Sequence, residues 1–214
     1  VKQFGTASLA FPTNQSVTLN PSSSFTFSGD FTIEAWTYVT PWTSAGISDD
    51  GYGGPTIMSC ANMGSAATIS GWSFGFDVTG KPRFVNFGGT GVVSPSVLSQ
   101  NAWHHIAVSR ESGQLRLFVD GIQVATATDS TRYGDSAYTT FIGRTAYTTA
   151  PRFFRGYIDS IRVSTVARYK KNFVLPTTSF AKQFEALNDP YNDMVVYNLP
   201  FDSNANSTTK GYNG

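Results

Sequence analysis

The chain has 214 residues and a formal net charge of +1, and only 14% of its residues are charged, although Phe, Tyr and Gly are abundant. This length suits one domain whose core needs neither a disulfide nor a metal. Without a strongly basic or acidic field, the chain is not expected to bind nucleic acid. The single cysteine, Cys60, excludes an internal disulfide and a cysteine metal cluster. No apolar run has the length of a membrane helix, so membrane insertion is not expected.

Apolar and polar residues alternate along most of the chain, which is the pattern of β-strands buried on one face. The segment FTIEAWTYV, residues 31–39, is the first long example. Its other face carries Thr, Glu, Trp and Tyr, so we expect a neighbour to cover that face. The predicted apolar face consists of Phe31, Ile33, Ala35 and Val39.

The middle of the chain predicts hairpins. WSFGFDV, residues 72–78, and RFVNF, residues 83–87, flank the turn TGKP and are expected to pair. WHHIAVSR, LRLFVDG and IQVATAT then predict a three-stranded meander, with one turn at residues 111–114. The second turn falls at Asp120-Gly121, a dipeptide that tolerates the left-handed geometry of a tight turn.

GYIDSIRVS, residues 156–164, is the last predicted core strand, and it contains one carboxylate. Strict alternation places Asp159 on the same face as Tyr157, Ile161 and Val163. A carboxylate among apolar neighbours must be hydrogen-bonded or paired. We therefore expect Asp159 to be structural, accepting from backbone amides or from an arginine.

Many short strands joined by turns predict an all-β fold, an antiparallel sandwich or barrel, and the many inward aromatics favour two stacked sheets. Two long Gly/Ser/Thr/Asn-rich loops, residues 40–56 and 128–152, are candidates for function. The composition changes beyond Phe180. We therefore assign residues 1–181 to one sandwich and residues 182–214 to a C-terminal tail or the start of a further repeat.

Six segments, in their order, resemble the laminin-G-like domains of the concanavalin A-like lectin/glucanase superfamily over residues 4–180. The chain is most similar to those of bacteriophage structural and tail proteins, in which a G-x-I-D-x-x-R strand leads into V-A-R-Y-x-x-N-F-x-x-P. The resemblance implies a jelly-roll β-sandwich of two antiparallel sheets, and it makes Asp159 part of the family's strand signature. The segments are FGTASLAFP, SGDFTIEAWTYV, WHHIAVSR, LRLFVDG, IGR and FRGYIDSIRVSTVARYKKNFVLP.

The tail is similar to the junction between repeats in such phage proteins. Asp189-Pro190-Tyr191, the apolar run MVVYNLPF and Phe201-Asp202 follow one another in that order. Two interpretations stay open. Either the chain is a piece of a longer polypeptide, or the tail strand pairs with this sandwich or with a neighbouring subunit by strand addition.

The sequence does not predict an enzyme. Glucanase relatives present two carboxylates as E-x-D-x-E on one strand, and none of the three glutamates here lies in such a pattern. His104 and His105 are adjacent, so on a strand they point to opposite faces and cannot grip one ion together. The resemblance makes W-H-H a structural strand start.

Calcium is the one metal that the resemblance suggests, because many laminin-G-like domains hold it at a rim loop through carboxylates and carbonyls. Calcium takes six to eight oxygen ligands. The alternative is that these loop acids are simply solvated. The candidate ligands are Asp49 and Asp50 in ISDDGYGG, and Asp129 and Asp135 in DSTRYGDS.

Glycan binding is the other function that the family resemblance implies. Sugar sites combine an aromatic platform with hydrogen bonds to hydroxyl groups, and the two long loops are rich in suitable side chains. The alternative is that these side chains pack against neighbouring subunits, where Tyr, Trp and Arg are equally favoured. The candidates are Trp42, Tyr52, Tyr133, Tyr138, Arg144, Tyr147 and Arg152.

Together, these observations predict a non-enzymatic virion structural protein of a bacteriophage: a capsid decoration, tail or fibre component that contacts host-surface glycans. Its expected partners are other virion subunits, including copies of itself in a homo-oligomer, and a cell-surface glycan. The alternative is an adhesin or carbohydrate-binding module at the bacterial cell surface or outside the cell, with or without a calcium requirement.

Overall fold

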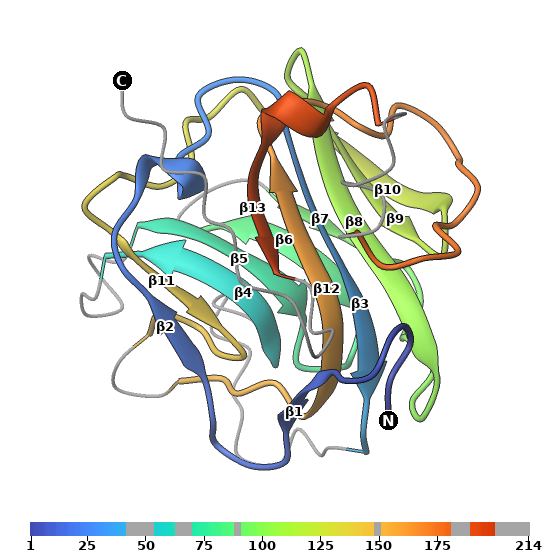
Figure 1. The fold of residues 1–214 in the computed structure, drawn as a ribbon. Coiled ribbons are helices and arrows are strands. Elements are labelled where there is room, and N and C mark those ends of the chain that lie inside the picture. Colours follow the sequence, from blue (N-terminus) through green and yellow to red (C-terminus); the bar gives the residue numbers. More distant parts are fainter. Residues whose placement is uncertain (42–53, 63–69, 88–90, 148–150, 181–188, 200–214) are drawn as a thin grey trace.

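The computed structural model describes residues 1–41, 54–62, 70–87, 91–147, 151–180 and 189–199. Their strands form two antiparallel sheets that lie face to face (Figure 1). The prediction of an all-β, two-sheet sandwich is confirmed. Within the described part of the chain, no helix has the length and apolar character needed to cross a membrane.

One sheet has seven strands, which in chain order are β1 (Leu9–Phe11), β3 (Phe31–Val39), β8 (Trp103–Glu111), β9 (Gln114–Val119), β10 (Ile122–Thr128), β12 (Gly156–Ser164) and β13 (Val195–Leu199). Their spatial order is β1-β12-β3-β8-β9-β10, and β13 also pairs with β12. The predicted meander is confirmed as β8, β9 and β10, since each pairs with the next in antiparallel register.

The other sheet has six strands, which are β2 (Val17–Leu19), β4 (Thr56–Ala61), β5 (Gly71–Phe76), β6 (Pro82–Asn86), β7 (Gly91–Val93) and β11 (Thr139–Ile142). Their spatial order is β2-β11-β4-β5-β6-β7. The predicted pairing of WSFGFDV with RFVNF is confirmed as the β5–β6 hairpin. Two short 3-10 helices, η1 (Ser23–Phe25) and η2 (Asn192–Met194), lie outside the sheets.

Aromatic side chains from both sheets fill the space between them. The Phe31 ring of β3 stacks on Phe27 with 4.5 Å between centroids and meets Tyr133 edge-on at 5.6 Å. Trp72 of β5 donates its indole N–H to the carbonyl of Phe25, so its polar atom is satisfied in the interior. The four predicted apolar residues of β3 are all buried in this core.

Strand β12 contains a β-bulge that the sequence did not predict. Ser160 has a φ of 58°, and the register between β12 and β3 shifts between Asp159 and Ile161. The extra residue reverses the alternation. Asp159 is therefore opposite Trp36 on the outer face, whereas Ile161 is opposite Ala35 on the core face. The prediction that Asp159 shares a face with Ile161 and Val163 is wrong for this reason.

The tail strand β13 joins the sandwich of its own chain. It pairs with the second half of β12, from Ile161 to Ser164, while β1 pairs with the first half, from Gly156 to Ile158. Because β3 occupies the other edge of β12, β1 and β13 lie end to end along a single edge. Figure 1 shows β13, in red, beside the orange β12. The fold of the described residues therefore extends past residue 181.

Candidate functional site

Four of the predicted ligand residues, Trp42, Tyr52, Asp49 and Asp50, lie outside the residues that the structure describes. The others do not form one group. Tyr133 and Asp129 lie in the interior, and Asp135 and Tyr138 lie in the loop before β11. The remaining three, which are Arg144, Tyr147 and Arg152, come from the segment after β11.

Tyr133 and Asp129 form a buried pair. The Tyr133 hydroxyl donates to an Asp129 carboxylate oxygen at 2.5 Å, and the other oxygen accepts from the backbone N–H of Thr131 at 2.7 Å. Burial alone would raise the pKa of Asp129, but these hydrogen bonds outweigh it and the pKa lies below its ordinary value. Tyr133 is fully buried, so it is a core residue and not the surface platform predicted for it.

Asp135 and Tyr138 stabilise the loop before β11. Asp135 accepts from the backbone N–H of Ala137 at 2.9 Å, which is a local turn contact. The Tyr138 hydroxyl hydrogen-bonds with Ser70 at 2.6 Å, and its ring is half-buried. In the described ranges, no group of three or more His, Cys, Asp or Glu side chains is placed to hold a metal ion.

Arg144 and Arg152 lie on facing arms of a hairpin, residues 143–147 and 151–154, which we call the Arg144 hairpin. Thr145 donates its N–H to the carbonyl of Arg152 at 3.1 Å, and Phe154 donates to the carbonyl of Gly143 at 2.9 Å. Gly143 has a φ of 85°, and a Cβ at this position would collide with the ring of Phe11. Glycine therefore fixes the point where the hairpin leaves β11.

The hairpin holds the Arg144 guanidinium against two aromatic rings. Its central carbon lies 4.4 Å from the centroid of Phe141 and 5.9 Å from that of Phe153. Phe141 points to the outer side of the six-stranded sheet, where Tyr147 packs beside it. Arg144, Tyr147 and Phe153 are all half-buried, so part of each remains open to solvent. The three form a cationic and aromatic surface.

Partial burial changes the pKa of Arg144. Desolvation lowers the pKa of the guanidinium from its ordinary value. Within the described residues, no carboxylate makes an ion pair with it, and its one hydrogen bond is from Nε to the carbonyl of Thr145 at 2.9 Å. An arginine stacked on aromatic rings without an acidic partner can donate to an oxygen-rich ligand.

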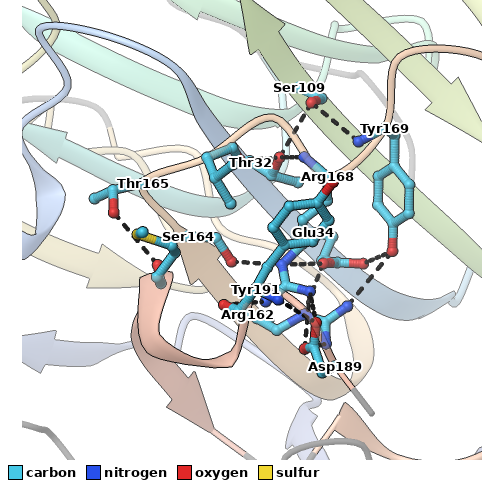
Figure 2. Close-up of polar contacts among 12 residues, drawn as sticks. Thr32, Glu34, Ser109, Arg162, Ser164, Thr165, Arg168, Tyr169, Asp189 and Tyr191 are labelled. Atoms are coloured by element: carbon cyan, nitrogen blue, oxygen red, sulfur yellow. Dashed lines mark hydrogen bonds and ion pairs between the residues drawn. The ribbon is translucent and has the colours of Figure 1, made fainter.

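The outer face of the seven-stranded sheet holds a second polar cluster, centred on Glu34 (Figure 2). One carboxylate oxygen accepts from Nε of Arg162 at 2.8 Å; the other accepts from the Tyr169 hydroxyl at 2.7 Å and from His105 Nε2 at 3.0 Å. Burial raises the pKa of Glu34, but Arg162 and His105 outweigh it, and the pKa lies far below its ordinary value. Glu34 is fully buried and ionised.

A second carboxylate extends this cluster into the C-terminal region. Arg168 binds both oxygens of Asp189, at 2.9 and 3.1 Å, and donates to the carbonyl of Tyr191 at 3.2 Å. The backbone N–H of Arg168 also donates to the hydroxyl of Thr32 on β3 at 2.9 Å. The neighbour expected over the polar face of β3 is thus a later segment of the same chain. The buried cluster fastens that segment and is not a binding site.

The glutamates therefore offer no pair for glycoside hydrolysis among the described residues. Glu34 is enclosed by its partners, and Glu111 pairs at the surface with Lys170 and with Arg116. Glu185 lies outside the described residues. The sequence missed the Glu34 cluster, although charged residues in the middle of two strands, Glu34 and Arg162, were a signal for it.

Asp159 lies at the other end of the same outer face. Its carboxylate accepts from the backbone N–H groups of Gln3 and Phe4, both at 3.0 Å, and the residue is almost fully buried. Phe4 in turn meets Trp36 edge-on at 5.4 Å. Asp159 thus holds the N-terminal segment against the sheet.

Comparison with known proteins agrees with this fold. Residues 11–171 match the laminin G family described as the concanavalin A-like lectin/glucanases superfamily. Among curated proteins, none matches the chain.

Solved structures of several carbohydrate-related proteins share the fold. A protein of Bacteroides ovatus proposed to bind carbohydrate is 20% identical, with a TM-score of 0.59 over 85% of this chain, and the chain spans 48% of its length. Domain 4 of an extracellular arabinanase of Geobacillus stearothermophilus, in complex with arabinotriose, is 15% identical, with a TM-score of 0.51 over 76% of this chain and 77% of that one. The CBM40 domain of a Ruminococcus gnavus sialidase, bound to sialyllactose, is 14% identical, with a TM-score of 0.51 over 71% and 80%.

Proposed function

Because the chain belongs to the laminin G family of the concanavalin A-like lectin/glucanases superfamily, we propose that it is a carbohydrate-binding domain. The likeness to the three solved structures is a likeness of fold, and two of them carry a bound oligosaccharide. The proposal for this chain therefore depends on a surface that suits sugars, and the Arg144 hairpin provides one.

The observation that carries the proposal is the position of Arg144 on Phe141 and Phe153. The apolar face of a sugar ring packs well on an exposed aromatic surface, and a guanidinium donates several hydrogen bonds in fixed directions to hydroxyl or carboxylate oxygens. Arg144 stands at 4.4 Å from the centroid of the buried Phe141 ring with no ion-pair partner among the described residues, and the aromatic surface open to a ligand consists of the half-buried rings of Phe153 and Tyr147. Ligand oxygens would take the donors that the protein leaves open.

In this proposal the domain binds glycans without hydrolysing their glycosidic bonds. Such hydrolysis needs two carboxylates about 5 to 10 Å apart at the scissile bond. The described glutamates are held in other contacts, with Glu34 fully buried and Glu111 in surface ion pairs. Calcium in the loop that contains Asp49 and Asp50 would support the site by ordering it, not by chemistry. Asp129 and Asp135 already accept hydrogen bonds from their own chain.

The setting that we propose is a surface that meets glycans. A carbohydrate-binding module or adhesin outside the cell, or at the bacterial cell surface, is one setting that suits a glycan-binding domain. The other setting is a virion component of a bacteriophage, assembled as a homo-oligomer with other subunits. The sequence resemblance to phage tail proteins supports this setting. An antibody against the domain would distinguish the two settings, because it should label intact phage particles only if the domain is a virion component.

A glycan array tests the binding function. The wild-type domain should bind at least one oligosaccharide saturably, and Arg144→Ala should weaken that affinity about tenfold, the loss expected for one charged hydrogen bond. Arg155→Ala is the matched control, because Arg155 follows the same hairpin but is exposed. Equal melting temperatures would show that both variants are folded. Absence of saturable binding by the wild type, or equal losses in both variants, would contradict the proposal.

A further inference from the structure

Three side chains at one end of the seven-stranded sheet form a hydrogen-bonded series. The Ser99 hydroxyl lies 2.7 Å from Nε2 of His104, and Nδ1 of His104 lies 2.6 Å from a carboxylate oxygen of Asp120. Ser99 belongs to the connection between β7 and β8, His104 to the start of β8, and Asp120 to the turn between β9 and β10. Three separate segments thus meet at one point.

The carboxylate fixes the protonation of the imidazole. Asp120 can only accept, so Nδ1 of His104 carries the hydrogen, and whenever the ring is neutral its Nε2 accepts from the Ser99 hydroxyl. The second oxygen of Asp120 accepts from the backbone N–H of His105 at 2.9 Å. Burial raises the pKa of Asp120, but its bonds to His104 and His105 outweigh it, and the pKa is lowered. The carboxylate is therefore ionised and held in place.

The position of the series leaves its nucleophile accessible. Ser99 is exposed, and the His104 side chain is 15% exposed, so the hydroxyl is open to solvent while the imidazole is largely enclosed. No acceptor within the described residues takes the backbone N–H of Ser99 or of Gln100. A negative oxygen that forms next to Ser99 needs backbone donors of this kind.

We infer that Ser99, His104 and Asp120 form an esterolytic triad, with Ser99 as nucleophile, His104 as general base and acid, and Asp120 as positioning residue. A nucleophile within hydrogen-bond reach of a base that is oriented by a third group is the arrangement that activates serine, whatever the fold around it. The sequence did not predict this triad, because the family resemblance makes His104 a structural residue at the start of a strand.

The chemical steps balance without a cofactor. Ser99 Oγ attacks the ester carbonyl carbon while its proton moves to Nε2 of His104. The bond from that carbon to the alcohol oxygen breaks, the His104 proton passes to the departing alcohol, and an acyl group stays on Ser99. Water then attacks the acyl carbon, gives its proton to His104, and releases the acid as His104 returns the proton to Ser99.

The substrate class that we assign is a short ester, an O-acetyl group on a sugar. Ser99 is exposed in a surface connection, and this suits a small acyl group carried on a larger molecule. The choice of a sugar as the alcohol rests on the proposed carbohydrate binding. The esterase chemistry of the triad does not depend on it.

A fluorophosphonate probe tests the nucleophile directly in the full chain. The probe should label one serine, and peptide mass spectrometry should place the label on Ser99. Ser99→Ala should abolish the labelling, whereas Ser96→Ala, an exposed serine of the same connection, should label as the wild type does. An unlabelled wild type, or a label that persists in Ser99→Ala, would overturn the triad.

Hydrolysis of p-nitrophenyl acetate tests the other two roles. His104→Gln should lower kcat about 100-fold or more, the usual range for a general base. Asp120→Asn should lower kcat with KM unchanged, provided that its melting temperature matches the wild type. If Asp120→Asn unfolds, the Ser99 label on the wild type still decides the proposal. A rate that Ser99→Ala leaves unchanged would mean that the three side chains are only structural.

Glycan binding and esterase activity can be separated by these experiments. Glycan binding without labelling of Ser99 would refute the triad and leave the carbohydrate-binding function intact. Labelling and acetate hydrolysis without any glycan binding would support the triad and refute the carbohydrate-binding function, including the assignment of a sugar ester. Release of acetate from an O-acetylated polysaccharide, lost in Ser99→Ala, would support both.

Discussion

Nε of Arg162 lies 2.8 Å from Oε1 of Glu34, and the two residues are direct cross-strand partners on β12 and β3. Both side chains are buried, beneath the segment that follows β12. Their alignment depends on the bulge at Ser160, which turns Arg162 to the outer face. The ion pair thus links a local backbone irregularity to the packing of the segment that follows β12 on the outer face of the sheet.

Removal of one partner from this pair should be costly. Glu34→Gln removes the closer of the two carboxylates that pair with the buried Arg162 and leaves only Asp189 at 3.6 Å, so the free energy of unfolding should fall by about 3 to 5 kcal/mol. Urea denaturation measures the change. Glu111→Gln is the control and should have little effect, since Glu111 takes part in surface ion pairs. Equal effects in the two variants would contradict the structural role of Glu34.

The same carboxylate should make stability depend on acid. The pKa of Glu34 in the folded chain lies far below the value of about 4.3 in an unfolded chain. The unfolded state therefore takes up the proton first as the pH falls. The contribution of Glu34 is complete above about pH 4.3 and is lost progressively below it. The difference in urea midpoint between wild type and Glu34→Gln should shrink from pH 7 to pH 2.5; a constant difference would refute this account.

Strand β13 should contribute to the stability of the whole sandwich. Tyr197 is buried in the main core, with its ring 5.5 Å from that of Phe25. Tyr197→Ala should lower the free energy of unfolding by about 3 to 5 kcal/mol, as for other large aromatic residues in cores. Val174→Ala should have no effect, because Val174 is 92% exposed. An unchanged urea midpoint in Tyr197→Ala would mean that β13 is dispensable.

Two aromatic residues of the long loops should affect glycan affinity. If the two long loops also contact the glycan, Trp42→Ala and Tyr138→Ala should each weaken binding to the oligosaccharide found on the array, because each removes an aromatic side chain on which a sugar ring packs. Tyr138→Phe keeps the ring and removes only the hydroxyl that contacts Ser70, so it should bind as the wild type does. Isothermal titration would measure the affinities. Full affinity in both alanine variants would exclude these residues from the site.

Chelation tests the calcium proposal. If calcium orders the loops, EDTA should lower the melting temperature, and added calcium should restore it, since a ligand that binds only the folded state stabilises it. Asp49→Asn combined with Asp50→Asn should remove the response to EDTA. Asp77→Asn is a control at a carboxylate that caps its own turn. A melting temperature that EDTA leaves unchanged would refute the calcium proposal.

The strands that the sequence predicted well are those in which alternation alone decides the face. The apolar residues of β3 and the β5–β6 and β8–β9–β10 hairpins follow a period of two, and turns such as Asp120-Gly121 fix their register. The bulge in β12 had no such signal. The residue with the positive φ is Ser160 and not a glycine, so the local sequence does not predict a bulge there.

The polar contacts were harder to predict because they join distant parts of the chain. Glu34 and Arg162 are 128 positions apart, and Asp159 binds amides 155 and 156 positions away. The polar loop around Tyr133 predicts a surface residue, yet the ring of Tyr133 lies in the core. The Ser99, His104 and Asp120 contacts span 5 and 16 positions, so the meander register could have suggested them.

Because β1 and β13 lie end to end along one edge of β12, a C-terminal truncation of the chain exposes part of that edge. A truncation after residue 181 would keep β12 but uncover its edge from Ile161 to Ser164, together with the core face that Tyr197 covers. An uncovered strand edge offers its N–H and C=O groups to any extended segment nearby. Such a fragment should self-associate through β12, whereas a version that continues through Leu199 keeps the edge closed.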